Sequence, residues 1–164
     1  MSAVISECGR YRYRLERSRN EGSGDTVFIM VNPSTADHEN NDHTIRKLLG
    51  FASRNGWDNL VVGNLFAFRA TDVRELATAA DPIGPENDEH LKAMISGALR
   101  LIFAWGPTSK LPKRLRTRWR TIYGMARDVG VIPHSLGPPA KDGHPCHPLM
   151  LPYTRRLEPW RPAL

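Results

Sequence analysis

The chain has 164 residues, of which 40% are hydrophobic and 24% are charged; this length and composition predict one folded domain and exclude a disordered chain. The sequence contains no run of about 18 apolar residues that could span a membrane and no apolar signal segment, so we expect a cytoplasmic protein. The formal net charge of +6 favours a polyanionic partner, because cationic side chains release counterions from phosphate backbones.

The first part of the chain predicts two strands and a helix. Residues 10–17 alternate large and charged side chains with a period of two, which is typical of an edge strand. Residues 26–31 are almost all apolar, as in a central strand that is covered on both faces. Together they predict an N-terminal hairpin over residues 10–31. Asp42 then can cap a helix with an apolar face, and Gly56 can end that helix in the left-handed conformation.

The rest of the chain alternates strands and helices. The predicted elements are, in order, a strand at 60–63, a short helix capped by Asp72, a helix that ends near 98, a strand at 100–105, a long helix opened by Pro112, and a strand at 131–136. This order predicts an α/β fold, a three-layer sandwich with a mostly parallel central sheet of about four strands plus the N-terminal edge strand. We expect residues 1–164 to form one domain whose tail, 137–164, is rich in proline, glycine and histidine and wraps the surface.

Polar residues follow two of the predicted parallel strands. Pro33 lacks an amide hydrogen and disfavours helical geometry at Asn32, so the first strand must end there. Asn64 ends the next strand in the same way. Because the carboxyl ends of parallel strands share one edge of a sheet, where such folds bind their ligands, we expect at least one of these asparagines to line a pocket. The alternative is that both only form turns, for which asparagine is common.

Five motifs carry a family resemblance. They are NPSTAD (32–37), NLFAFRATD (64–72), GPENDEH (84–90), AWG (104–106) and DGHPCHPLML (142–151). With them, the chain resembles the bacterial and phage family catalogued as domain of unknown function 1643, over about residues 27–151. That family name implies no activity.

A second resemblance is more distant and concerns the uracil-DNA glycosylase superfamily. Met30-Val31-Asn32-Pro33-Ser34 is similar to its Gly-Ile-Asn-Pro-Gly motif at the end of the first strand, and residues 64–70 are similar to its Asn-Val-Val-Lys-Cys-Arg-Pro motif. Pro85-Glu86 before a helix, and His144-Pro145 or His147-Pro148 near the end, match further features. The resemblance implies a uracil-DNA-glycosylase-like fold, and a protein that binds a nucleobase and excises a damaged or modified base by hydrolysis of the N-glycosidic bond.

Such a reaction assigns roles to particular side chains. Breaking an N-glycosidic bond needs a polar group that places water and a donor for the departing base anion. Asn32 would position the water, and His144 or His147 would stabilise the leaving base. The predicted base-binding residues are Asn64, Phe66, Phe68, Pro33 and Ser34. The predicted phosphate-binding residues are Arg69, Arg114, Arg116 and Arg118.

The predicted partner is nucleic acid, with DNA favoured, or a nucleotide, and the scheme requires no cofactor and no metal. Cys8 and Cys146 are too far apart for a metal motif, and two cysteines are too few for the iron–sulfur branch of the superfamily. Local patterns also allow simpler interpretations. The arginines of residues 114–120 are typical of the solvent-facing side of a helix, as an alternative to phosphate binding. Phe66 and Phe68 are more typical of core residues than of a surface on which a base stacks.

Two other functions stay open. The first is a metal-dependent hydrolase of a nucleotide or phosphoester, because imidazole and carboxylate are suitable metal ligands. Its candidate ligands would be His144, His147, His38, His43, Asp37 and Asp42. The second is a non-catalytic protein that binds a base or nucleotide in the same pocket, since Asn32 cannot act as a base.

Overall fold

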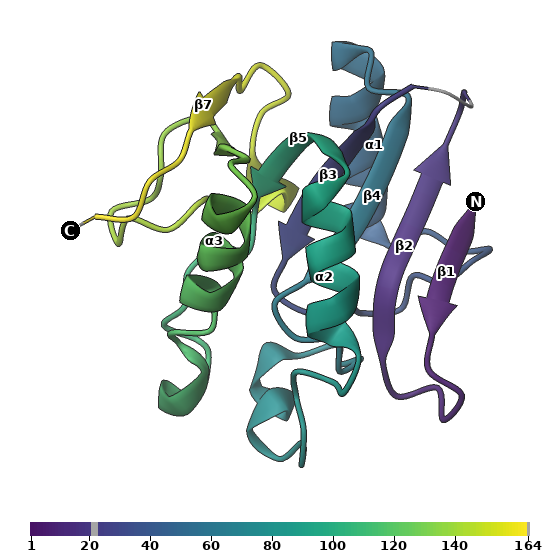
Figure 1. Ribbon diagram of the computed structural model, residues 1–164, viewed down its shortest axis with the longest axis vertical. Helices are drawn as coiled ribbons and strands as arrows, with labels where there is room; N and C mark the ends of the chain where they lie inside the picture. The colour runs from purple at the N-terminus through teal and green to yellow at the C-terminus, as the bar shows by residue number, and fades with distance from the viewer. Residues whose placement is uncertain (21–22, 164) are drawn as a thin grey trace.

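The computed structural model describes residues 1–20 and 23–163, and in them one seven-stranded mixed sheet runs through the molecule (Figure 1). The strands are β1 (Ser2–Ile5), β2 (Arg12–Ser18), β3 (Asp25–Met30), β4 (Asn59–Asn64), β5 (Ala98–Phe103), β6 (Pro133–Leu136) and β7 (Leu157–Pro159). Their spatial order is β1-β2-β4-β3-β5-β6-β7. The inner four, β4-β3-β5-β6, are parallel, while β1, β2 and β7 pair antiparallel at the two sides.

The α/β class is confirmed, but the predicted sheet of about four strands plus one edge strand is too small. The predicted hairpin over residues 10–31 does not form: β2 pairs antiparallel with β1 and with β4, while β3 lies between β4 and β5. Residues 21 and 22 of that segment lie outside the described residues. The extra strands come from residues 2–5, and from the tail, where β7 pairs with β6.

Helices pack on both faces of the sheet because the central strands are apolar on both sides. In β3, Val27 and Ile29 belong to one buried cluster, and Phe28 and Met30 belong to the other. The first cluster contains the apolar faces of α2 (Asn87–Ser96) and α3 (Trp119–Asp128), and the second contains that of α1 (His43–Asn55). Figure 1 shows α2 and α3 on the near face and α1 on the far face.

The ends of α1 follow the predicted signals. The Asp42 carboxylate accepts a hydrogen bond of 2.8 Å from the Ile45 amide, which satisfies one of the free donors of the first turn. Gly56 adopts φ +66°, a left-handed conformation that an L side chain rarely adopts, and its amide bonds to the Ala52 carbonyl. These local signals fix where α1 begins and ends along the chain.

The long helix predicted from Pro112 is divided. Residues Lys113–Leu115 form a 3₁₀ turn, and α3 begins only at Trp119. Between them the amide of Arg118 bonds to the carbonyl of Leu115, three residues back, so the α-helical pattern is not yet established. Two further 3₁₀ turns lie at Val73–Ala77 and Pro148–Met150. No helix in the described part of the chain is long and apolar enough to cross a membrane.

Candidate functional site

A cleft of about 1110 Å³ lies at the edge of the sheet where β3 and β5 end. Its walls come from residues 31–35 after β3, the N-terminal end of α1, residues 70–74, residues 105–110 after β5, and the loop around His147. This edge carries the carboxyl ends of the parallel strands, which is where open α/β sheets bind ligands. The cleft is therefore the candidate functional site.

Asn32 lines the cleft in a fixed orientation. Its side-chain amide nitrogen donates to the carbonyl oxygens of Ala70 at 2.8 Å and of Pro33 at 3.1 Å. Because both partners are acceptors, the nitrogen and the oxygen of the amide cannot be interchanged. The Ala70 amide in turn donates to the Pro33 carbonyl at 2.9 Å. The side-chain oxygen of Asn32 makes no hydrogen bond with the described residues, so it is the group that can accept one from a ligand or water.

His147 reaches the same cleft from the tail. Its Nδ1 atom accepts a hydrogen bond of 3.2 Å from the Leu149 amide, so the neutral ring carries its proton on Nε2. Burial lowers the pKa of His147 below its ordinary value; Lys110 acts in the same direction and Asp42 opposes it. The ring is therefore neutral near pH 7, with Nε2–H as a donor.

Gly106 allows the His147 loop to approach β5. This glycine has φ +77°, and a Cβ atom there would lie 3.0 Å from the Cβ atom of His147. Its amide donates to the Pro145 carbonyl at 3.0 Å. The glycine of the AWG motif and the second histidine of the DGHPCHPLML motif thus meet at the cleft, although positions 106 and 147 are 41 residues apart in the sequence.

His144 lies behind this surface. Its Nδ1 atom accepts a hydrogen bond of 3.3 Å from the Trp105 indole, and its Nε2 atom lies 3.3 Å from the Thr108 hydroxyl. Its ring makes an edge contact with Trp119 at 5.6 Å between centroids, and burial lowers its pKa. His144 does not line the cleft. Its contacts with Trp105, Thr108 and Trp119 instead hold the loop that carries His147.

The other predicted base-binding residues are divided between the cleft and the core. Ser34 lines the cleft, and Pro33 is buried beneath it. Asn64 is only 2% exposed, and its amide nitrogen has no hydrogen-bond partner among the described residues. Phe66 is fully buried, and the half-buried Phe68 packs edge-on against another ring. In this conformation neither Asn64 nor the two phenylalanines line the cleft.

The four predicted phosphate-binding arginines each donate to a main-chain carbonyl of the protein. The pairs are Arg69 with Gly9, Arg114 with Ala77, Arg116 with Ser109, and Arg118 with Leu65. Arg118 is buried and also pairs with the Asp88 carboxylate. None of the four lines the cleft. The interpretation of residues 114–120 as one solvent-facing basic surface is thus incorrect for Arg118, whose side chain joins the core to α2.

Sequence reasoning missed the role of several cleft residues. Asp72 was recognisable only as a helix cap, and Asp42 only as a helix cap or a metal ligand, yet both line the cleft, as do Trp105 and Lys110. Arg74 pairs with Asp72 and lowers the pKa of that carboxyl to about 2. Lys110 has no ion-pair partner among the described residues. In that same part of the chain, no group of three or more His, Cys, Asp or Glu side chains is arranged to hold a metal ion.

Comparison with known proteins agrees with the first resemblance. The family described as "Protein of unknown function (DUF1643)" matches residues 12–149, which include every wall of the cleft. Neither the curated proteins nor the solved structures contain a match to the chain. The family resemblance is confirmed, and the resemblance to uracil-DNA glycosylases stays a prediction.

Proposed function

We propose a function for this chain on the premise that it belongs to the DUF1643 family: its cleft binds a nucleobase, in nucleic acid or in a nucleotide, and hydrolyses the N-glycosidic bond. The observation that carries this proposal is that Asn32 and His147 line one cleft with opposite hydrogen-bonding character. The first offers an acceptor oxygen and the second offers a donor N–H. These are the two groups that the reaction needs.

In the proposed reaction the bond between the sugar C1′ atom and the base nitrogen breaks, and its electron pair leaves with the base. The Nε2–H group of His147 donates to the developing base anion, while the Asp42 carboxylate stabilises the positive charge on the sugar. Water then adds to C1′ and one of its protons passes to the departed base anion, so that the products are the neutral base and the sugar with a hydroxyl group on C1′. The side-chain oxygen of Asn32 accepts a hydrogen bond from that water and so orients it.

The neutral state of His147 supports its role as a donor to an anion. Burial keeps the ring uncharged near pH 7, and the bond from the Leu149 amide directs the remaining proton to Nε2. Trp105 lines the cleft where Phe66 and Phe68 do not, but it is only 3% exposed, so it gives a base apolar contact and no open stacking surface. The net charge of +6 favours an anionic substrate. Lys110, which has no ion-pair partner among the described residues, can contact a phosphate at the cleft, whose other charged lining residues are Asp42 and the paired Asp72 and Arg74.

A non-catalytic nucleobase- or nucleotide-binding protein is the second candidate. It is favoured by one observation, that Asn32 is an amide with its nitrogen already bonded and cannot remove a proton from water. The hypothesis of a metal-dependent hydrolase has no support from the geometry, because no three His, Cys, Asp or Glu side chains of the described residues are arranged to hold a metal ion.

The test is base release. Purified protein is incubated with single- and double-stranded oligonucleotides that carry uracil, hypoxanthine, oxidised or hypermodified bases, and with the matching nucleotides; released base and abasic sites are measured by chromatography and strand cleavage. The variants are His147→Gln and Asp42→Asn, which keeps a good helix cap. His38→Gln, which replaces an exposed histidine outside the cleft, is the matched control.

We expect release from the wild type and the His38 variant and at least a 100-fold loss in the His147 variant, in the range for removing one general acid or charge-stabilising donor. Binding that depends on His147 without base release supports the second candidate. If the protein neither releases base nor binds a ligand at the cleft, both candidate functions are rejected.

A further inference from the structure

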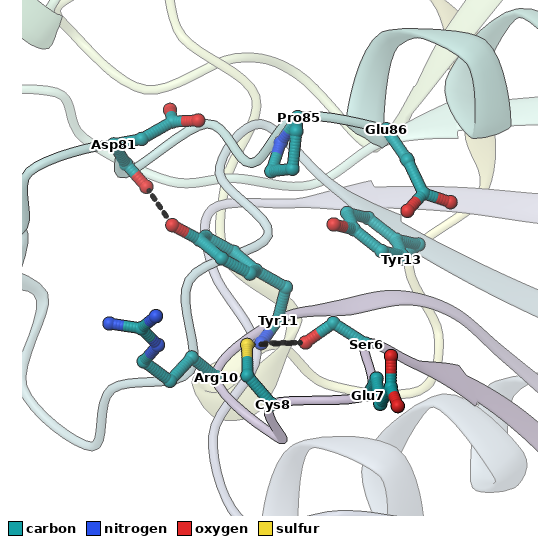
Figure 2. A pocket seen from close by; sticks show the side chains of 9 residues that line it. All are labelled: Ser6, Glu7, Cys8, Arg10, Tyr11, Tyr13, Asp81, Pro85 and Glu86. Atoms are coloured by element: carbon teal, nitrogen blue, oxygen red, sulfur yellow. Dashed lines mark hydrogen bonds between the residues drawn. The ribbon is translucent and has the colours of Figure 1, made fainter.

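A second pocket, of about 590 Å³, lies on the turn that joins β1 to β2 and shares no lining residue with the cleft (Figure 2). The turn closes with a hydrogen bond of 2.8 Å from the Gly9 amide to the Ser6 carbonyl. It displays Cys8 as an exposed free thiol on the wall of the pocket. The turn precedes residues 12–149, so it lies outside the part of the chain that matches the family.

Two neighbours favour the thiolate form of Cys8. The Ser6 hydroxyl lies 3.3 Å from the sulfur, and its oxygen already accepts a bond of 3.1 Å from the Tyr11 amide, so the hydroxyl hydrogen is free to point at the sulfur. The Arg10 guanidinium adds positive charge. Together the Ser6 hydroxyl and Arg10 lower the pKa of the Cys8 thiol to about 7. An exposed thiol with this environment is nucleophilic at neutral pH.

The pocket also contains a buried polar group that lacks a partner. Tyr13 is 2% exposed and lines the pocket, and its hydroxyl makes no hydrogen bond with the described residues. Buried hydroxyl groups are normally bonded, because an unpaired one costs about 1–3 kcal/mol. Figure 2 shows this hydroxyl turned toward the middle of the pocket, on the side of Tyr11. A polar atom of a ligand in the pocket would satisfy it.

The charges around the pocket are of both signs. Arg10 and the Glu7 carboxylate lie on the same side as Cys8, and the carboxylates of Asp81 and Glu86 lie on the opposite side (Figure 2). A ligand that carries both a carboxylate and an ammonium group can pair with both sides. Low-molecular-weight thiols of the amino-acid type have this chemistry, and they also have the sulfur that a thiolate can bond.

We propose that Cys8 is a site of mixed-disulfide formation with a zwitterionic, amino-acid-type thiol, and that the pocket holds the adduct. The Cys8 thiolate attacks one sulfur of the low-molecular-weight disulfide. A new S–S bond forms, the old S–S bond breaks, and its electron pair leaves on the second sulfur as a thiolate. Excess free thiol reverses the exchange. This modification is independent of the function proposed for the cleft.

The first experiment measures thiol reactivity in the full chain. The protein is treated with iodoacetamide between pH 5.5 and 9, and labelling is followed by peptide mass spectrometry, with Cys146 as the internal control. We expect the labelling rate of Cys8 to reach half of its maximum near pH 7. At pH 7 Cys8 should react at least about threefold faster than Cys146, because Cys8 is exposed and half ionised, and the lower nucleophilicity of a low-pKa thiolate offsets only part of this advantage. Labelling of Cys8 no faster than that of Cys146 overturns the proposal.

The second experiment tests the pocket with Tyr13→Phe, which keeps the ring and removes the hydroxyl. The probes are glutathione disulfide and the uncharged bis(2-hydroxyethyl) disulfide, and thermal unfolding confirms that the variant is folded. We expect the variant to lower equilibrium glutathione incorporation about threefold to tenfold, the worth of one hydrogen bond, with the iodoacetamide rate unchanged. The wild type should prefer glutathione to the uncharged probe. Equal incorporation in variant and wild type, or no preference between probes, overturns the role of the pocket.

Discussion

Replacing Asn32 by Asp tests the orientation on which the proposed site depends. The Asn32 amide nitrogen donates to two carbonyl oxygens, at 2.8 and 3.1 Å. A carboxylate would lose both bonds and present an oxygen to those carbonyls. Two lost hydrogen bonds cost about 2 kcal/mol, and the repulsion at this half-buried position adds about 1 kcal/mol, so the free energy of unfolding should fall by about 3 kcal/mol at pH 7.5. The melting temperature should fall by about 9 °C.

The penalty of this variant should depend on pH. A protonated carboxyl can donate to the Ala70 carbonyl in place of the amide, so the folded state of Asn32→Asp should raise the pKa of the new carboxyl above its unfolded value of about 3.9. The folded state then binds the proton more tightly, and stability falls as pH rises through the raised pKa. The penalty should therefore be smaller at pH 5 than at pH 7.5. Asn32→Ala, which loses the same bonds without a charge, should show a penalty that does not change.

Urea denaturation of the wild type and both variants at pH 5 and 7.5 measures these differences. A penalty for Asn32→Asp below about 0.5 kcal/mol, or one that is equal at both pH values, would refute the reasoning. The amide nitrogen, and not the oxygen, would then face the cleft, and the assignment of Asn32 as an acceptor for water would fail with it.

Three further predictions concern the neighbouring structure. Burial lowers the pKa of His147 below 6.5, so the unfolded chain binds more protons than the folded one and stability is lost as pH falls through 6.5. His147→Gln should therefore reduce the drop in melting temperature between pH 7 and 5.5. A drop as large as that of the wild type would show that burial of His147 is not its cause. Arg118→Ala should lower the free energy of unfolding by about 2 kcal/mol, because it removes the bond from Arg118 to the Leu65 carbonyl, which keeps only the bond of 3.3 Å from Asn87, together with the ion pair to the half-exposed Asp88. Arg114→Ala should cost under about 0.5 kcal/mol in the same urea titration; similar costs for the two variants count against a stabilising role of the buried Arg118 side chain. Asp42→Ala should destabilise by about 1 kcal/mol and Asp42→Asn by far less, since asparagine also caps helices; an equal loss by urea unfolding argues against the cap.

Patterns close together in the sequence determined much of the fold. The apolar runs of β3 and β4 identified central strands because a strand covered on both faces must be apolar at every position. Asp42 and Gly56 marked the ends of α1 because each acts on main-chain groups within a few residues. The Asn32-Pro33 step ended its strand for the same local reason. These predictions required no knowledge of distant contacts.

The partners of these elements were decided only by the tertiary structure. Residues 12–18 look like one strand of a hairpin with β3, yet they pair with β4, because strand pairing depends on which apolar faces meet across the whole sheet. The interpretation of Phe66 as a core residue is confirmed, but no local pattern shows that Arg118 turns inward to the Leu65 carbonyl. Both histidines of the tail precede proline in the sequence. His147 alone reaches the cleft, because the indole of Trp105 holds His144 behind it and Gly106 leaves room for the loop to approach.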